Sequence, residues 1–143
     1  MKRFFSDSPI LLQQGIAGIR IIVGLFMIYH GWEVFDKAAM QGYAGWDQFK
    51  GMASPSLMVY LGKGAELMAG LLLTAGCLTR LAALVLVITM LYISFFVGHG
   101  KIWYDDQHPF LFVLLGFVFF FTGPVKWSLD QLKLKQKSTY HSY

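Results

Sequence analysis

The chain has 143 residues, of which 56% are hydrophobic, 17% are aromatic and only 14% are charged. This composition is typical of an integral membrane protein and excludes an ordinary soluble domain. The formal net charge is +4, but the basic residues are spread unevenly over the loops, which favours a signal of membrane orientation and excludes nucleic-acid binding. The single cysteine, Cys77, excludes an intramolecular disulfide and dithiol chemistry of the Cys-x-x-Cys type.

Four apolar runs predict the fold. Each approaches the length of about 20 residues that a helix needs to cross the hydrocarbon core of a bilayer. The predicted helices cover residues 10–31, 57–76, 81–98 and 109–125. We therefore expect an all-α, integral membrane four-helix bundle that forms one domain over residues 1–143.

The loops between these helices differ in basic charge, and cytoplasmic loops carry the excess of Lys and Arg. On one side of a four-span topology lie Lys2, Arg3, Arg80, Lys126, Lys133, Lys135 and Lys137. On the other side lie Lys37, Lys50 and Lys101. This asymmetry predicts that both termini are cytoplasmic.

Two charged residues, Arg20 and Glu66, fall about half-way along the first and second predicted helices. A charge at that depth costs at least ~2.5 to 3.5 kcal/mol, so it normally has a partner or a function. Small residues share a helical face with each charge, which allows the two helices to approach closely. The two faces are Gln13, Ala17, Arg20, Gly24, Met27 and Gly31, and Gly62, Glu66, Gly70, Leu73 and Cys77.

We expect the Arg20 guanidinium to contact the Glu66 carboxylate, directly or through Lys63 or one water, with Lys63 on the neighbouring flank of the second helix. Two interpretations of this group remain open. It is either a static ion pair that fixes the helix register or a polar floor for a bound small molecule, with Glu66 as a protonatable carboxylate.

The loop over residues 32–56, between the first two helices, carries aromatic residues among charges and glycines, namely Trp32, Phe35, Tyr43, Trp46 and Phe49. Such residues suit a segment at the membrane interface, so we expect this loop to cover the outer mouth of the bundle. Tyr92, Phe96 and His99 share a stripe in the outer half of the third helix. The fourth begins at Pro109 and stops at Gly123-Pro124, and the polar tail after Trp127 is expected to fray.

Histidines and carboxylates gather in the predicted outer loops, and these residue types ligate transition metals or relay protons. No His-x-x-His or similar spacing occurs, so we predict no metal site. The weaker alternative is a metal held by His30, His99, His108 and Asp105. Asp105 and Asp106 also have a structural role available, next to the positive N-terminal end of the fourth helix.

Three short stretches carry a resemblance to a known family. They are Arg20-Ile-Ile-Val-Gly-Leu-Phe-Met-Ile-Tyr-His30-Gly31, Glu66-Leu-Met-Ala-Gly-Leu-Leu-Leu-Thr-Ala-Gly76 with Thr79-Arg80-Leu-Ala-Ala, and Gly123-Pro-Val-Lys-Trp-Ser-Leu-Asp130. In this order and spacing, the chain resembles the DoxX family of small bacterial membrane proteins. The resemblance implies a four-helix, multi-pass protein of the bacterial inner membrane, and its namesakes are linked to thiosulfate:quinone oxidoreduction and to membrane redox complexes. The chain departs from the family's pattern after His30-Gly31 and at His108.

Two functional hypotheses follow, and whether the chain is an enzyme stays open in both. In the first, the chain is a redox-associated subunit that binds a quinone or a similar hydrophobic molecule and receives electrons from a partner protein. Its pocket would open to the outer leaflet between the first three helices, above Arg20, Glu66 and Lys63, and would be lined by His30, Tyr92, Phe96, His99, Trp32, Trp46 and Trp103. In the second, it is a non-enzymatic module that binds or transports a lipid or small solute, with Glu66 as a proton-sensitive ligand.

Overall fold

The computed structural model describes residues 10–140, and every regular element in that range is helical. The helices are α1 (Leu12–Gly31), α2 (Lys37–Ala44), α3 (Pro55–Ala75), α4 (Thr79–Tyr92), α5 (Gln107–Thr122) and α6 (Leu129–Tyr140). Two 3-10 turns, η1 (Trp32–Phe35) and η2 (Asp47–Phe49), flank α2, and a π-helical segment, η3 (Ile93–Val97), extends α4. Lys2 and Arg3, used above for the orientation, lie outside the described residues.

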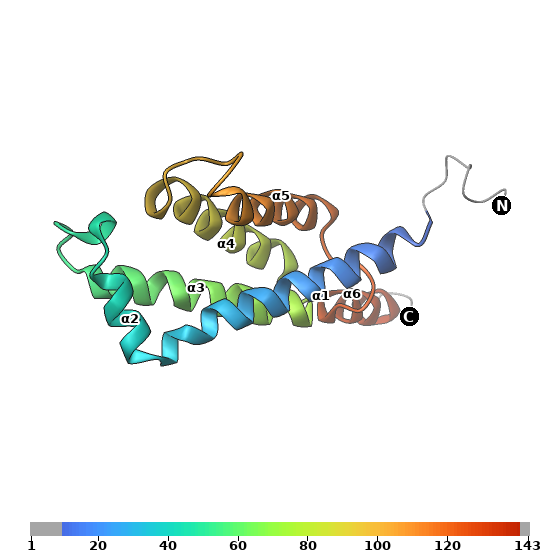
Figure 1. Ribbon diagram of the computed structural model, residues 1–143. Coiled ribbons are helices and arrows are strands. Elements are labelled where there is room, and N and C mark those ends of the chain that lie inside the picture. The colour runs from blue at the N-terminus through green and yellow to red at the C-terminus, as the bar shows by residue number, and fades with distance from the viewer. Residues whose placement is uncertain (1–9, 141–143) are drawn as a thin grey trace.

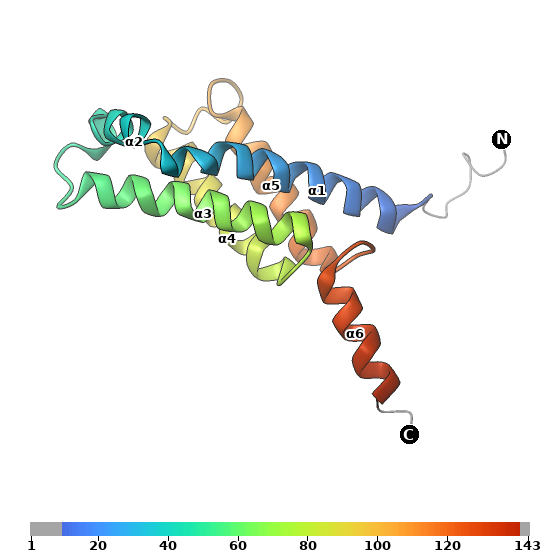
Figure 2. The same cartoon turned by 90° about the horizontal axis from the view of Figure 1, so that it is seen from below.

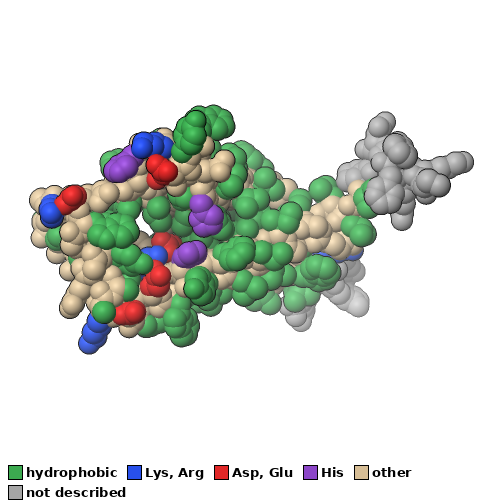
Figure 3. All heavy atoms as spheres, viewed as in Figure 1, with side chains coloured by type: hydrophobic (Ala, Val, Ile, Leu, Met, Phe, Trp, Pro, Cys, Tyr) green, Lys and Arg blue, Asp and Glu red, His purple; other side chains and the backbone are tan. Residues whose placement is uncertain are grey.

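Three helical segments are long and apolar enough to cross a membrane: Leu12–Phe35, Pro55–Ala75 and Thr79–Val97. α5 is equally apolar in character but shorter, at 16 residues. Large hydrophobic side chains face outward along all four helices, for example Ile22, Leu71, Ile88 and Phe117. Figure 3 shows this apolar exterior along the helical body, with charged side chains gathered toward the end that holds α2. An apolar exterior of this kind suits lipid as its surroundings.

The helices pack as two antiparallel pairs (Figure 1). α1 lies against α3, α4 lies against α5, and α3 and α4 join the pairs. α2 and its flanking turns cover one end of the bundle, whereas α6 leaves the opposite end at an angle (Figure 2). The start of α1 and the whole of α6 therefore lie toward the same end of the molecule.

Glycines bring α1 and α3 into backbone contact. A Cβ added at Gly70 would lie 2.6 Å from the Ile28 nitrogen and 2.8 Å from the Gly24 oxygen. Gly24 and Gly31 meet the α3 backbone in the same way, at Thr74 and Leu67. The predicted close approach of the two helices is therefore present. The buried face of α1 is also the predicted one except for Gln13, which is exposed.

α6 is fastened to the turn between α3 and α4. The Asp130 carboxylate accepts hydrogen bonds from the Leu78 nitrogen at 2.9 Å and from the Thr79 nitrogen and hydroxyl at 2.8 and 2.9 Å. The Asp130 nitrogen donates to the Gly76 oxygen at 3.0 Å. Partial burial alone would raise the pKa of Asp130, but the hydrogen bonds from Thr79 and Leu78 outweigh it and hold that pKa below its ordinary value. Asp130 thus stays ionised and caps the start of α4.

Two expectations about irregular segments were wrong. The tail after Trp127 forms α6 rather than fraying, because the Ser128 hydroxyl accepts from the Gln131 nitrogen as an N-cap and Asp130 ties the first turn down. The segment between α1 and α3 is not one extended loop. Asp36 caps α2 by accepting from the nitrogens of Ala38 and Ala39, and α2 packs against α3.

Candidate functional site

A chain of three charged side chains runs from the C-terminal end of α1 into the bundle. The Lys63 ammonium lies 2.9 Å from a Glu33 oxygen and 3.1 Å from a Glu66 oxygen. Exposure of the side chains falls along this series, from 36% for Glu33 to 17% for Lys63 and 4% for Glu66. The Lys63–Glu66 contact is local, because residues three apart share a helix face. Only tertiary packing brings Glu33 to them.

Tyr43 of α2 contacts two members of this charged series, Glu33 and Lys63. Its hydroxyl donates to Glu33 at 3.0 Å, and its ring lies 5.4 Å from the Lys63 ammonium. Lys63 also donates to the His30 carbonyl oxygen at 3.4 Å. Burial first, and then the hydrogen bond to the Glu33 carboxylate, raises the pKa of Tyr43. Tyr43 therefore remains a neutral donor that orients Glu33 toward Lys63.

Among the described residues, Arg20 contacts Glu66 neither directly nor through Lys63, so these two forms of the predicted contact were wrong. Arg20 is fully buried and donates to the carbonyl oxygens of Leu73, of Thr74 at 3.5 Å and of Trp127 at 2.7 Å. Leu73 follows Glu66 by two helical turns, roughly 10 Å along α3. Carbonyls in the last turn of a helix lack helical partners and attract cations, so the guanidinium binds there instead.

A cavity of about 190 Å³ lies beside the inner end of the charged series. α3 contributes Lys63, Glu66 and Gly62, and α4 with η3 contributes Thr89, Tyr92, Ile93 and Val97. α2 and its flanking residues cover it with Tyr43, Trp46 and Phe49. The lining is thus apolar and aromatic, apart from the ion pair at one end. No residue of α1 lines it, so its position differs from the predicted one between the first three helices.

Several predicted lining residues lie elsewhere. Phe96 stacks on Tyr92 with 5.2 Å between ring centroids but is itself turned outward. Trp32, Trp103 and His99 are exposed. Helical spacing predicts which residues share one face of a helix, but it does not predict which of them reach a cavity next to that face.

His30 faces a different neighbour, His108 of α5, with 6.2 Å between ring centroids. The two line a separate hollow with Leu25, Phe26 and Tyr29. Within residues 10–140, no group of three or more His, Cys, Asp or Glu side chains is arranged to hold a metal. The alternative metal set is therefore divided: His99 is exposed and the Asp105 carboxylate lies beside the Lys101 ammonium at 3.5 Å.

Asp106 has a structural role that differs from the predicted helix-dipole one. Its carboxylate accepts from the nitrogens of His99 and Lys101 at 2.9 and 2.8 Å, and so shapes the turn between η3 and α5. Gly98 is needed there because a Cβ would overlap the same carboxylate.

The predicted lining did not include eight of the residues that line the cavity, namely Tyr43, Phe49, Met58, Val59, Gly62, Thr89, Ile93 and Val97. Tyr43 and Phe49 were expected only as aromatic residues of the covering loop. Thr89 had a visible signal, because it is the one hydroxyl residue in the middle of an otherwise apolar span, Leu81 to Tyr92. Gly62 precedes Lys63 and leaves open space where a Cβ would stand. Tyr43 and Phe49 carried no signal beyond their aromatic character, since the fold of residues 32–54 alone decides where they point.

A family model described as DoxX matches residues 15–99. The match covers more than half of the chain, from α1 through η3, and includes the charged series and the whole cavity lining. Searches of curated proteins and of solved structures gave no match. The match and the apolar helices together identify a multi-pass membrane protein in contact with the lipid bilayer.

Proposed function

The chain belongs to the DoxX family, and from this premise we propose that it binds the ring of a hydrophobic, oxygen-bearing small molecule, a quinone above all, in the cavity beside Lys63 and Glu66. This proposal rests on one observation. The ion pair of Lys63 and Glu66 lines a cavity whose other walls are mainly aromatic and apolar. Apolar pockets with a few convergent polar groups are the usual form of a small-molecule site.

The size of the cavity supports a ring-sized ligand. An apolar cavity of about 150 Å³ is enough to hold one benzene molecule in a protein core, and the cavity here measures about 190 Å³. It is too small for a whole isoprenoid quinone. The head group would therefore occupy the cavity, and the tail would leave toward the lipid.

The two charged groups suit both redox forms of such a head group. A quinone carbonyl oxygen would accept the Lys63 hydrogen bond that now goes to the His30 oxygen at 3.4 Å. The Glu66 carboxylate would accept a hydrogen bond from a quinol hydroxyl. Glu33 and Tyr43 continue this polar series to the outer surface. A redox-associated role follows, in which a partner protein supplies the electrons.

Gly62 and Gly64 allow a matched test, because a Cβ at either meets nothing within 4 Å but only Gly62 lines the cavity. We expect Gly62→Leu to weaken binding of a short-chain quinone by at least about tenfold through steric overlap, whereas Gly64→Leu leaves it unchanged. The titration would follow tryptophan quenching in nanodiscs. Trp46→Phe should remove most of the quenching and Trp103→Phe should not, because only Trp46 lines the cavity. Equal affinities for the two leucine variants would refute the site.

The second candidate function is a lipid-binding or solute-binding module in which Glu66 is the proton-sensitive ligand. The small cavity volume and the depth of Glu66 favour it. Mass spectrometry of the molecule that copurifies with the protein decides between the two. A quinone supports the redox role, and a lipid or small solute supports the module.

We also propose four membrane crossings with both termini on the cytoplasmic side of a bacterial inner membrane. α5 is about 24 Å long at the helical rise of about 1.5 Å per residue, which is shorter than a bilayer core of about 30 Å, and local thinning of the bilayer accommodates such a difference. Gly123, at its end, lies against the Arg80 side chain at the start of α4. This return of the chain and the excess of basic residues at the same end support a fourth crossing.

A further inference from the structure

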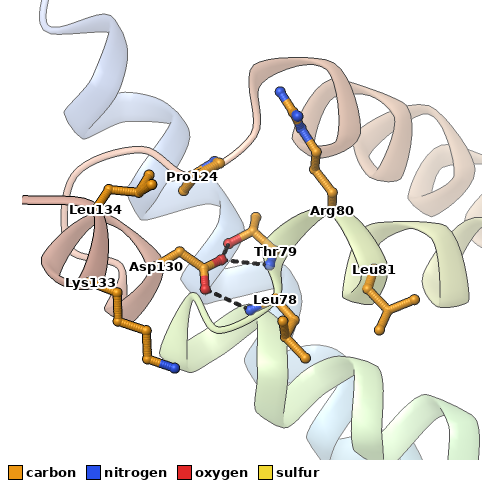
Figure 4. A pocket seen from close by; sticks show the side chains of 8 residues that line it. All are labelled: Leu78, Thr79, Arg80, Leu81, Pro124, Asp130, Lys133 and Leu134. Carbon is orange, nitrogen blue, oxygen red and sulfur yellow. Dashed lines mark hydrogen bonds between the residues drawn. The ribbon is translucent and has the colours of Figure 1, made fainter. Parts of the chain in front are cut away.

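A second hollow lies at the opposite end of the bundle, between the first turn of α4 and α6 (Figure 4). Its volume is about 530 Å³. The connection of α5 to α6 passes beside it at Pro124, and the Asp130 capping bonds form its floor. It is separate from the cavity of the proposed function, with which it shares no lining residue.

Two cations, Arg80 and Lys133, border this hollow on opposite sides of the Asp130 hydrogen bonds, with Arg80 pointing toward the connection between α5 and α6 and Lys133 pointing away from it (Figure 4). Both are exposed, and neither forms an ion pair with any described residue. Asp130 is the acid that lines the hollow with them, and its carboxylate oxygens accept hydrogen bonds from Leu78 and Thr79. Because two cations and one carboxylate line it, the hollow keeps a net positive charge that would attract an anion.

Apolar side chains border the same hollow. Leu78, Leu81 and Leu134 are between 53% and 58% exposed. The hollow lies where α3 ends and α4 begins, at the boundary between the apolar spans and the basic end of the molecule. In a membrane, cations at this boundary lie at the level of the lipid head groups. The exposed leucines beside them lie next to the acyl chains.

We propose that this hollow is a binding site for the phosphodiester head group of an anionic phospholipid. Arg80 would bind two phosphate oxygens with its planar guanidinium, and Lys133 would add a second positive charge from α6. In Figure 4 the two cationic groups point away from each other, but both side chains are long and exposed, so each would turn inward on the lipid to reach the phosphate. Leu81 and Leu134 would contact the acyl chains, and the lipid would link α4 to α6 beside the Asp130 cap.

Native mass spectrometry of the detergent-solubilised protein tests the proposal with phosphatidylglycerol and phosphatidylcholine as probes. We expect phosphatidylglycerol to bind the wild type in preference to phosphatidylcholine. Arg80→Gln and Lys133→Gln should each weaken its binding by about fivefold, the effect of one cation near an anionic lipid. Arg80→Lys should retain more affinity than Arg80→Gln, because it keeps the charge but loses the bidentate contact.

Lys126→Gln is the matched control. Lys126 is exposed at the same end of the molecule but does not line the hollow. Equal losses for Lys126, Arg80 and Lys133 would show a diffuse surface attraction and overturn the site, as would a wild type without preference for phosphatidylglycerol. If millimolar inorganic phosphate binds with the same dependence on Arg80 and Lys133 and displaces the lipid, the site takes soluble phosphate and the lipid assignment is wrong.

Discussion

Lys63 lies between two carboxylates, and this arrangement explains how a charged residue persists in an apolar span. Two charges removed from water are tolerable when each is close to the other, but the loss of one leaves its partner uncompensated. Glu66 is the more buried carboxylate, and among the described residues it forms an ion pair only with Lys63, whereas Glu33 also accepts a hydrogen bond from Tyr43. The buried Arg20 charge is instead stabilised by hydrogen bonds that it donates to backbone carbonyl oxygens.

A pair of double-mutant cycles distinguishes these two solutions. Lys63→Met should destabilise the detergent-solubilised protein by about 3 kcal/mol, the lower end for a broken buried pair, and Lys63→Met with Glu66→Leu should recover part of that loss. Arg20→Met with Glu66→Leu should be additive, since residues more than about 7–10 Å apart without shared partners do not couple. Thermal unfolding measures both cycles. Non-additivity in the Arg20 cycle would mean that the two residues contact each other after all.

The packing of α1 on α3 depends on glycines more than on large interlocking side chains. Without a hydrophobic driving force between helices in lipid, close backbone approach gives the dispersion contacts that hold such a pair together. Gly70 lies against the backbone at Gly24 and Ile28, so nothing there can move aside as a flexible side chain would. Gly18, also on α1, has open space around the position of a Cβ.

Alanine substitutions at these two glycines should have opposite effects. Gly70→Ala would force α1 and α3 apart and should lower stability by about 1–3 kcal/mol, as overpacking does. Gly18→Ala should be neutral or should stabilise by up to about 1 kcal/mol, because Ala is the better helix former. The midpoint of thermal unfolding in detergent reports both. A Gly70→Ala protein as stable as Gly18→Ala would contradict the close approach.

At the scale of the whole molecule, the number of crossings decides on which side each site lies. With four crossings, the cavity at Lys63 lies near the outer face and the hollow at Arg80 lies at the cytoplasmic face. If α5 did not cross the membrane, the connection from α5 to α6 would lie on the outer side of the membrane, as α2 does. The basic residues of that end would then break the usual excess of positive charge in the cytoplasm.

Cysteine labelling tests this topology. In a Cys77→Ser background, which has no other cysteine, Gly45→Cys should react with a membrane-impermeant maleimide added to intact spheroplasts. Lys126→Cys should react only after lysis. Both positions are exposed, so a lack of reaction reflects the membrane and not burial. Reaction of Lys126→Cys in intact spheroplasts would rule out the proposed four crossings with cytoplasmic ends.

Apolar length and the helical period are local properties, and from them the sequence predicted the apolar helices α1, α3, α4 and α5 and most of the inner face of α1, but not α2 or α6. It identified the inward position of Arg20, Gly24 and Gly70, and the pairing of Lys63 with Glu66 follows from a spacing of three residues. Tertiary structure alone decided how far α1 and α3 are shifted along each other, which turned Arg20 toward the end of α3 and brought Glu33 to Lys63. It also assembled the cavity from α2, η2, α3 and α4, because periodicity fixes the face of a helix but neither its axial register nor its partners.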